Sequence, residues 1–215
     1  MLAVDPFQGD VTARFKSIHF IVDAISAFLC DRVDMGAMGI DLLITSSQKA
    51  MGLAPGLSVV ILSPRALEAA AAIKPRCHYF AFSRYLSDGK RGQTPFTPAV
   101  GTILQLRARL DRIVGQGAAV QVARCGALAK RFRGVIAGLP FRLFPDRPSN
   151  ALTALNPTDG VSAYEVYSRL RREHRLVVTP NGGKLRDSVF RVGHMGNLDE
   201  ADMDEVARAL GEVSR

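Results

Sequence analysis

The chain has 215 residues, of which 47% are hydrophobic and 22% are charged, and its formal net charge is +8 at neutral pH. This length and balance indicate a globular protein of one or two domains. No uncharged apolar run reaches about 18 residues, so we expect no membrane span. The N-terminus lacks the apolar stretch of a signal peptide, so we expect a cytoplasmic protein.

The cations and the cysteines exclude two further classes of protein. The cations are scattered along the chain, and the densest basic runs, at 130–133 and 169–175, fall in helical patterns, so they predict solvated faces and no nucleic-acid site. Cys30, Cys77 and Cys125 are far apart and without CxxC spacing. We therefore expect reduced, mostly buried thiols, with no disulfide framework and no metal site.

Three apolar runs in the first part of the chain predict buried strands, namely IHFIV at 18–22, DLLIT at 41–45 and LSVVILS at 57–63. Uninterrupted apolar strands are usually covered on both faces, so we expect helices on both sides of this sheet. Few residues precede the first strand, and the sheet therefore resembles the second half of a larger one.

Helical patterns follow these strands. Helices are expected at 64–73, with Pro64 in the first turn, at 78–89, and from 99 to about 138 with a break at 115–117. The segment 89–98 is rich in Gly, Pro and Thr and is predicted to be a loop.

The last part of the chain mixes short strands with two helices. Strand-like runs lie at 140–144, 151–156, 176–179 and 189–193, and helical patterns at 163–174 and 199–210. This mixture predicts a compact α/β sandwich. We expect three regions, which are a partial large domain (1–115), a connecting helix (116–137) and a small C-terminal domain (138–215).

Asp23 and Lys49 are the first candidates for chemistry. Each follows an apolar strand, and Lys49 comes 26 residues after Asp23. Ligands of α/β sheets bind beyond the carboxyl ends of the strands. A lysine near buried strands with no acidic neighbour is costly to keep charged, and such lysines serve as nucleophiles or Schiff-base formers. A surface lysine and a strand-end aspartate are the structural alternatives.

The stretch from VDAIS to SSQK, with APGLSVVILS, GQTPFTPAVG and VFRVGHMGN further on, resembles class V pyridoxal-phosphate aminotransferases of fold type I. The resemblance is strongest to the alanine/serine–glyoxylate (or pyruvate) group, in which a strand ends in VD(A/S) and SxQK follows about 26 residues later. It runs from about residue 18 to the end and corresponds to the C-terminal half of the family only. The fold implied is α/β, with part of the large-domain sheet, flanking helices and a small C-terminal α/β sandwich.

The resemblance implies roles for four residues in catalysis. Lys49 would hold pyridoxal 5'-phosphate as an aldimine and move protons between the substrate Cα and the cofactor. Asp23 would pair with the pyridinium nitrogen, because the protonated ring accepts carbanion electrons best. Ile25 would lie against one face of the ring, and Arg191 would bind the substrate carboxylate bidentately.

Further residues are implied in cofactor binding. Gln48 and Ser47 would contact the cofactor phosphate from the same subunit. Thr94 and Thr97 would reach it from the neighbouring subunit, through the loop 92–97, so the resemblance implies a homodimer. Taken singly, the two threonines could also be ordinary loop hydroxyls or, for Thr97, a helix cap.

The function implied is transamination between a small amino acid of the alanine or serine type and a 2-oxo acid, glyoxylate or pyruvate. An alternative is 2-aminoethylphosphonate–pyruvate aminotransferase, whose C-terminal pattern is similar, although there asparagine typically precedes the lysine. Gln48 in that position favours the alanine/serine–glyoxylate group. In cysteine desulfurases a histidine precedes the lysine, which argues against that activity.

A second alternative is a non-catalytic truncated fragment, or one subunit of a split enzyme. The missing first half of the family would supply a Gly-rich phosphate cradle and a stacking ring. We therefore expect the chain alone to bind the cofactor weakly and to associate. His194, close to Arg191, is expected to be structural, and Arg191 itself could be a surface ion-pair partner.

Overall fold

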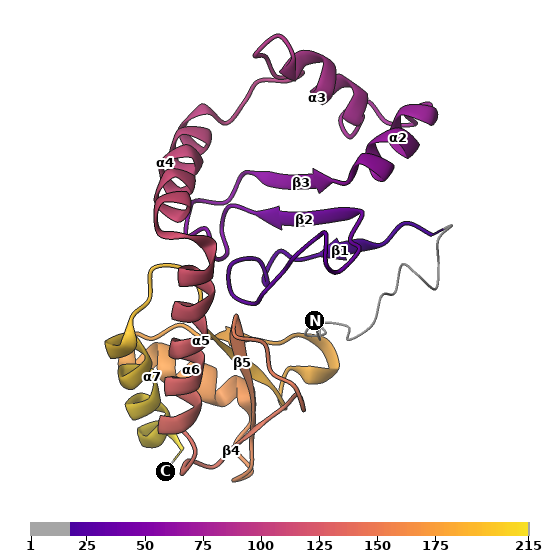
Figure 1. The fold of residues 1–215 in the computed structure, drawn as a ribbon. Helices are drawn as coiled ribbons and strands as arrows, with labels where there is room; N and C mark the ends of the chain where they lie inside the picture. The colour runs from indigo at the N-terminus through magenta and orange to yellow at the C-terminus, as the bar shows by residue number, and fades with distance from the viewer. Residues whose placement is uncertain (1–17, 215) are drawn as a thin grey trace. The chain divides into compact units, whose positions relative to one another are not determined.

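The computed structural model describes residues 18–214, which form two compact units. The first unit contains residues 18–25 and 33–112, and the second contains residues 26–32 and 113–214. Each unit has a sheet of its own (Figure 1). The division therefore falls within a long helix and assigns one short early segment to the second unit. The three-region organisation expected above stays a prediction.

The first unit is built on a three-stranded sheet with the order β1-β2-β3. Its elements are β1 (Ile21–Asp23), β2 (Leu42–Ser46), β3 (Ser58–Leu62), α2 (Pro64–Ala72), α3 (Phe82–Gly89) and most of α4 (Val100–Gln116). The three predicted strands are confirmed. β1 is parallel to β2, whereas β3 runs antiparallel to it.

The burial of this sheet differs from the prediction. The middle strand β2 is well covered, and Leu43 is 1% exposed. Ile21 in β1 is 60% exposed, and Val60 and Ile61 in β3 are each 38% exposed, so the expectation of buried first and third strands was wrong. β3 lies at the edge of the sheet, and packing within residues 18–214 leaves both of its faces partly open. An uninterrupted apolar run thus identifies a strand without showing what covers it.

A buried carboxylate fixes the starts of three elements in the first unit. Asp41 accepts hydrogen bonds from the Phe20 backbone N–H (2.9 Å) and the Ser63 hydroxyl (3.0 Å), and from Nε of Arg65 (2.9 Å). The ion pair with Arg65 holds the pKa of Asp41 well below its usual range, against the opposing effect of burial. Ser63 also caps α2 by accepting from the Ala66 N–H (3.1 Å).

Two observed helix boundaries can be compared with the boundaries predicted from the sequence. The helix expected from residue 78 begins only at Phe82, because Ala81 has an extended backbone. Residues 78–80 instead carry the aromatic side chains of a cluster. The predicted break near 115–117 is confirmed, since Gly117 between α4 and the next helix has a φ of +89°, which glycine adopts readily.

The second unit packs three helices on a four-stranded antiparallel sheet with the order β4-β5-β7-β6. Its elements are α5 (Ala118–Val135), β4 (Phe141–Leu143), β5 (Leu152–Pro157), α6 (Ala163–His174), β6 (Thr179–Pro180), a short 3-10 helix η1 (Gly183–Leu185), β7 (Phe190–Gly193) and α7 (Glu200–Val213). The other predicted strands and helices are confirmed, whereas the strand expected at 176–179 is wrong except for Thr179, because β6 comprises only Thr179–Pro180.

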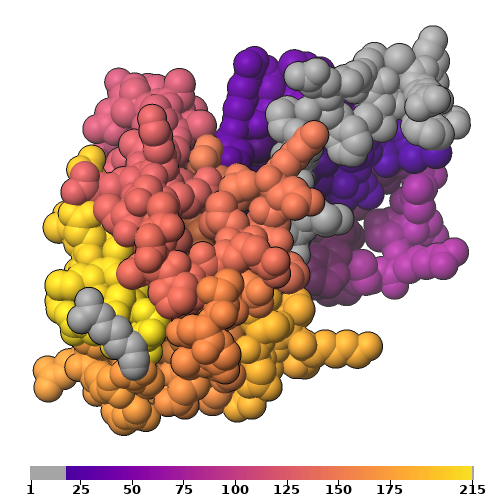
Figure 2. Space-filling model, turned by 90° about the horizontal axis from the view of Figure 1, so that it is seen from below, coloured from indigo at the N-terminus to yellow at the C-terminus, as the bar shows by residue number. Residues whose placement is uncertain are grey.

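One hydrophobic core holds this unit together. Its largest buried side chains include Phe132 from α5, Leu155 from β5, Leu170 from α6, Phe190 from β7 and Met203 from α7. Figure 2 shows α5 and α7 side by side at the surface, in rose and yellow. The chain therefore has the α/β fold predicted, with two sheets and flanking helices, although the described helices do not cover both faces of the first sheet as expected. None of the helices described is long and apolar enough to cross a membrane.

Candidate functional site

The parallel pair of strands brings Asp23 and Lys49 to one edge of the sheet. Asp23 is the last residue of β1 and is in register with Ile44 of β2. The Ala24 N–H extends this pairing by donating to the Ile44 carbonyl (2.9 Å). β2 ends two residues later at Ser46, and Lys49 lies in the turn that follows. Carboxylate and ammonium groups thus follow neighbouring parallel strands, where ligands of α/β sheets bind.

The carboxylate of Asp23 is exposed, and one of its two oxygens accepts a hydrogen bond. Its Oδ1 accepts a hydrogen bond from the Ile25 N–H (2.9 Å), which forms a small turn after the strand. Within the described residues, no cation pairs with Asp23. Ile25 is half-buried directly after it. The group is therefore oriented by its own turn and keeps one oxygen open to a ligand.

The turn that carries Lys49 is fixed while the side chain is unpaired. The Lys49 carbonyl accepts from the Gly52 N–H (2.9 Å), and Gly52 has a φ of +68°. Nε of Arg109 on α4 donates to the Met51 carbonyl (3.1 Å). Lys49 is half-buried and forms no ion pair within residues 18–214, whereas Gln48 beside it is exposed. A half-buried ammonium without a partner fits a lysine used in covalent chemistry.

Ser47 has a structural task in this turn. Its hydroxyl donates to the Ala54 carbonyl (2.7 Å) and accepts from the Leu57 N–H (3.3 Å). Its backbone N–H donates to the Leu57 carbonyl (3.1 Å), and its carbonyl accepts from the Leu53 N–H (3.1 Å). Ser47 therefore closes the loop between β2 and β3, and its hydroxyl is already committed to protein groups.

Ser46 is the residue that the sequence reasoning missed. Its hydroxyl is buried and has no hydrogen-bond partner within the described part of the chain. Side chains alternate along a strand, so Ser46 lies on the same face as Ile44 and its register partner Asp23. Ile44 on this face is half-buried, whereas Leu43 and Thr45 on the other face are buried. The unpaired hydroxyl and the carboxylate thus share the more open face of the sheet. The SSQK motif offered both serines, and only the hydrogen bonds distinguish them.

Thr94 and Thr97 lie in an exposed loop of the first unit. The Thr94 hydroxyl donates to the Phe96 carbonyl (2.7 Å). Phe96 stacks on Tyr79, with 4.8 Å between the ring centroids. The loop is therefore built on aromatic contacts, and both threonines are accessible.

Arg191 belongs to the second unit, and its guanidinium is incompletely satisfied. Its neighbours Phe190 and Val192 in β7 face the core, so Arg191 lies on the opposite face of the sheet. One terminal nitrogen donates a long bond to the Pro180 carbonyl (3.4 Å). Nε is buried and has no hydrogen-bond partner within residues 18–214. A buried unpaired guanidinium nitrogen is costly, and an anionic ligand would satisfy it.

His194 fits the structural role expected for it. Its Nδ1 lies 3.1 Å from the Asn150 carbonyl oxygen, and its Nε2 lies 3.2 Å from the Thr153 hydroxyl. Burial lowers the pKa of His194 to about 4, so the imidazole is neutral at physiological pH.

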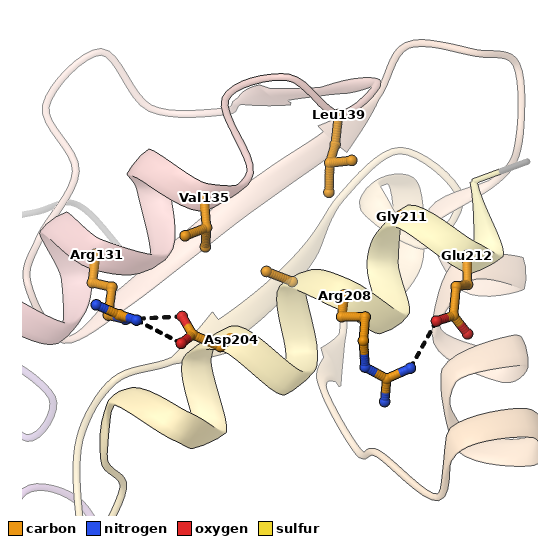
Figure 3. A pocket seen from close by; sticks show the side chains of 8 residues that line it. Arg131, Val135, Leu139, Asp204, Arg208, Gly211 and Glu212 are labelled. Atoms are coloured by element: carbon orange, nitrogen blue, oxygen red, sulfur yellow. Dashed lines mark hydrogen bonds and ion pairs between the residues drawn. The ribbon is translucent and has the colours of Figure 1, made fainter.

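A groove of about 560 Å³ lies between α5 and α7 in the second unit (Figure 3). It is lined by Arg131, Val135, Leu139, Asp204, Ala207, Arg208, Gly211 and Glu212. Arg131 binds Asp204 through two hydrogen bonds of 2.8 and 2.6 Å, and Arg208 pairs with Glu212 at 2.7 Å. Both cations are thus neutralised by the protein, and no residue predicted from the sequence lines the groove. Within the described residues, no cluster of three or more His, Cys, Asp or Glu side chains could hold a metal.

The sequence of this chain is similar to sequences of known aminotransferases. The sequence profile of the family Aminotransferase class-V matches residues 5–184. The serine–glyoxylate aminotransferase of Arabidopsis thaliana is 31% identical over 187 residues, which are 85% of this chain and 47% of the relative. The 2-aminoethylphosphonate–pyruvate transaminase of Burkholderia pseudomallei is 32% identical over 215 residues, which are 97% of this chain and 57% of the relative.

The fold has a close counterpart among solved structures. The aspartate aminotransferase of subgroup IV from Thermus thermophilus superposes with a TM-score of 0.85 at 30% sequence identity. The match covers 94% of this chain and 57% of that protein. The chain spans about half the length of the curated relatives it matches.

Proposed function

Because the chain belongs to the class-V aminotransferase family, which depends on pyridoxal phosphate, we propose that it carries the cofactor lysine of such an enzyme. The reaction that we propose is transamination between a small amino acid of the alanine or serine type and a 2-oxo acid, glyoxylate or pyruvate. The similarity to a serine–glyoxylate aminotransferase supports this choice of substrates. The chain spans about half of that relative, so the activity is proposed for the protein of which this chain is the matched part.

The parallel register of Asp23 with Ile44 is the observation that supports the proposal best, because Lys49 follows the same strand as Ile44. The residues present also fit the cofactor. Asp23 has an open carboxylate oxygen for a ring nitrogen, and Ser46 has a buried hydroxyl without a partner. When bound, pyridoxal phosphate supplies an electron sink for the carbanion formed at the substrate Cα.

Three side chains would perform the central chemistry. Lys49 would hold the cofactor covalently and, once released, take and return the proton at the substrate Cα. Asp23 would keep the ring nitrogen protonated through a charge-assisted hydrogen bond. Ile25, half-buried after Asp23, would cover one face of the ring.

The cofactor phosphate and the substrate carboxylate need separate donors. Gln48 and Ser46 would donate to the phosphate, and Ser47 would hold their turn closed. Thr94 and Thr97 would reach the phosphate of the neighbouring subunit in a homodimer. These hydroxyls are exposed in the monomer, as such a role requires.

Arg191 would bind the substrate carboxylate. Its buried Nε lacks a partner, and a bidentate carboxylate would provide one. Within this proposal the chain corresponds to the C-terminal part of a fold type I enzyme. Residues 1–115 would form part of the large domain, 116–137 the connecting helix and 138–215 the small domain.

A second candidate function is 2-aminoethylphosphonate–pyruvate transamination. The relative with that name matches 97% of this chain, more than the serine–glyoxylate enzyme does. Both candidates would use the same lysine, aspartate and sheet edge, and the amino donor distinguishes them best.

A half-reaction assay separates the candidates. The protein of which this chain is the matched part is loaded with pyridoxal phosphate and mixed with L-alanine, L-serine or 2-aminoethylphosphonate, and the carbonyl product is measured by mass spectrometry. The proposal predicts pyruvate from alanine or hydroxypyruvate from serine. Phosphonoacetaldehyde alone would establish the second candidate. A protein that binds the cofactor at Lys49 and yields no product from any of these donors would contradict the proposed transamination.

A further inference from the structure

Two buried cysteines, Cys30 and Cys125, both contact Asn150 in the second unit, Cys30 through its carbonyl and Cys125 through its sulfur. Sγ of Cys125 on α5 lies 3.1 Å from the carbonyl oxygen of Asn150 and 3.6 Å from that of His194. Nδ2 of Asn150 donates to the Cys30 carbonyl (3.3 Å). Cys30 is 0% exposed and Cys125 is 5% exposed. The two cysteines are therefore neighbours in the interior, although 95 positions separate them in the sequence.

The turn that presents Cys30 is held by tertiary contacts. Leu29 has a φ of +62°, a left-handed conformation that leucine rarely adopts by itself. The Asp31 carboxylate accepts from the Asn150 N–H (3.0 Å) and from the Ser149 hydroxyl. These bonds on the far side of Cys30 compensate the unfavourable backbone and fix the position of its thiol.

The pKa values of the two thiols are shifted in opposite directions. The hydrogen bond from the Cys30 thiol lowers the pKa of Cys125, and the charges of Arg124 and Arg133 act in the same direction, against burial and the Asp31 carboxylate. The same hydrogen bond and burial raise the pKa of Cys30. These directions favour Cys125 as the thiolate of the pair, and the thiolate is the reactive form of cysteine.

We propose that Cys30 and Cys125 form a redox modification site, which a small hydroperoxide converts into an intramolecular disulfide. The inference stands on the geometry of the second unit and is independent of the proposed transamination. The burial of both sulfurs restricts the oxidant to one as small as hydrogen peroxide.

The chemistry takes two displacements. The Cys125 sulfur attacks one peroxide oxygen, the O–O bond breaks, and a sulfenic acid and one water form. The Cys30 sulfur then attacks the Cys125 sulfur, the S–O bond breaks, and the hydroxyl leaves as a second water with the proton of Cys30. Two thiols lose two electrons and two protons, and one hydrogen peroxide becomes two waters.

The disulfide would tie the segment 26–32 covalently to α5. Cross-linking two distant positions restricts the unfolded chain, so the oxidised protein is expected to have the higher midpoint of thermal unfolding. Cys77, in contrast, is exposed, and it is replaced in the test so that only the two buried thiols can react.

Peptide mapping tests the proposal in the full chain with Cys77→Ser, which removes the exposed thiol. The folded, reduced protein is treated with hydrogen peroxide, the remaining thiols are alkylated after denaturation, and the chain is digested with trypsin without reductant. We expect peptides 17–32 and 125–130 joined at a mass two hydrogens below their sum, and separated again by reductant. We also expect the oxidised protein to unfold at a higher temperature than the reduced protein.

The controls decide the remaining outcomes. In the Cys77→Ser background, the added substitution Cys30→Ser should leave Cys125 as a sulfenic acid without a linked peptide and without the thermal shift. Two free thiols after peroxide treatment of the parent would overturn the proposal. Links between different chains, or a further oxidised Cys125 with Cys30 still free, would overturn it equally.

Discussion

At the scale of single residues, the polar atoms without partners are the most informative feature of the chain. Ser46 Oγ and Arg191 Nε are both buried and unsatisfied within residues 18–214. Buried polar groups are nearly always hydrogen-bonded, so an exception calls for a specific explanation. A phosphate at Ser46 and a carboxylate at Arg191 supply such explanations, and each can be tested separately.

The two adjacent serines form a matched pair for mutation. Ser47→Ala removes two hydrogen bonds of the loop between β2 and β3 and should lower the free energy of unfolding by about 1–3 kcal/mol. Ser46→Ala removes none, so stability should change by less than about 0.5 kcal/mol. The affinity for pyridoxal phosphate should instead fall about tenfold. Urea unfolding and equilibrium dialysis measure the two effects. Unchanged cofactor affinity in Ser46→Ala would remove Ser46 from the phosphate site.

Arg191 should act on the substrate and not on the cofactor. Arg191→Lys keeps the charge but loses the bidentate geometry. We expect KM to rise for the amino acid and the oxo acid alike, by the equivalent of about 1.5–3 kcal/mol. Steady-state kinetics measures this rise, with cofactor absorbance as the control. Loss of the cofactor at unchanged substrate affinity would assign Arg191 to the phosphate site or to the fold.

At the scale of elements, the sequence predicted where strands and helices lie better than how they are covered. Apolar runs located β1, β2 and β3, and Gly117 marked the break after α4. The same runs could not show that β3 is an antiparallel edge strand with Val60 and Ile61 partly exposed. Register and coverage depend on segments distant in sequence. The sequence could not distinguish Ser46 from Ser47 for the same reason, because the hydrogen bonds of Ser47 come from the next loop, and the role of either serine in phosphate binding stays a prediction.

The Asp41 cluster should be a main source of stability in the first unit. Asp41→Asn removes the charge that binds Arg65, and we expect the free energy of unfolding to fall by about 1.5–3 kcal/mol. The pKa of Asp41 is lowered in the folded state, so its contribution is present above the ordinary aspartate pKa of about 4 and is lost as pH falls through the folded value. Urea unfolding at pH 7 and at lower pH tests both points.

A surface ion pair provides the control for this substitution. Asp88→Asn removes the exposed pair with Arg91, which should be worth about 0–1 kcal/mol. Equal losses for Asp88→Asn and Asp41→Asn would contradict the role given to the buried carboxylate.

At the scale of the whole molecule, the first unit exposes an unusual number of aromatic side chains. Tyr79 and Phe80 are 57% and 74% exposed, and Tyr79 stacks on Phe96 beside the two loop threonines. Clustered exposed apolar side chains mark interaction surfaces. The sequence reading proposed a homodimer in which this loop reaches the neighbouring subunit, and the cluster would lie in that contact.

The aromatic cluster should therefore drive self-association. We expect concentration-dependent dimerisation of the chain in sedimentation velocity, and Tyr79→Ser with Phe80→Ser should shift it toward the monomer because the apolar contact is lost. Val177→Ser in the second unit, where Val177 is 75% exposed, should leave the association unchanged. A chain that stays monomeric at all concentrations, or a double variant that dimerises like the parent, would contradict this assignment.

The central claim is that Lys49 is the lysine that holds pyridoxal phosphate. The chain is incubated with the cofactor, reduced with borohydride to fix the lysine–pyridoxal bond, digested with trypsin and mapped by mass spectrometry. Trypsin does not cleave at a modified lysine, so we predict the label in peptide 33–65, on Lys49. Lys90→Arg should keep this label, and Lys49→Arg should lose it. A label on Lys74 or Lys90, or no stable label on any lysine, would contradict the account.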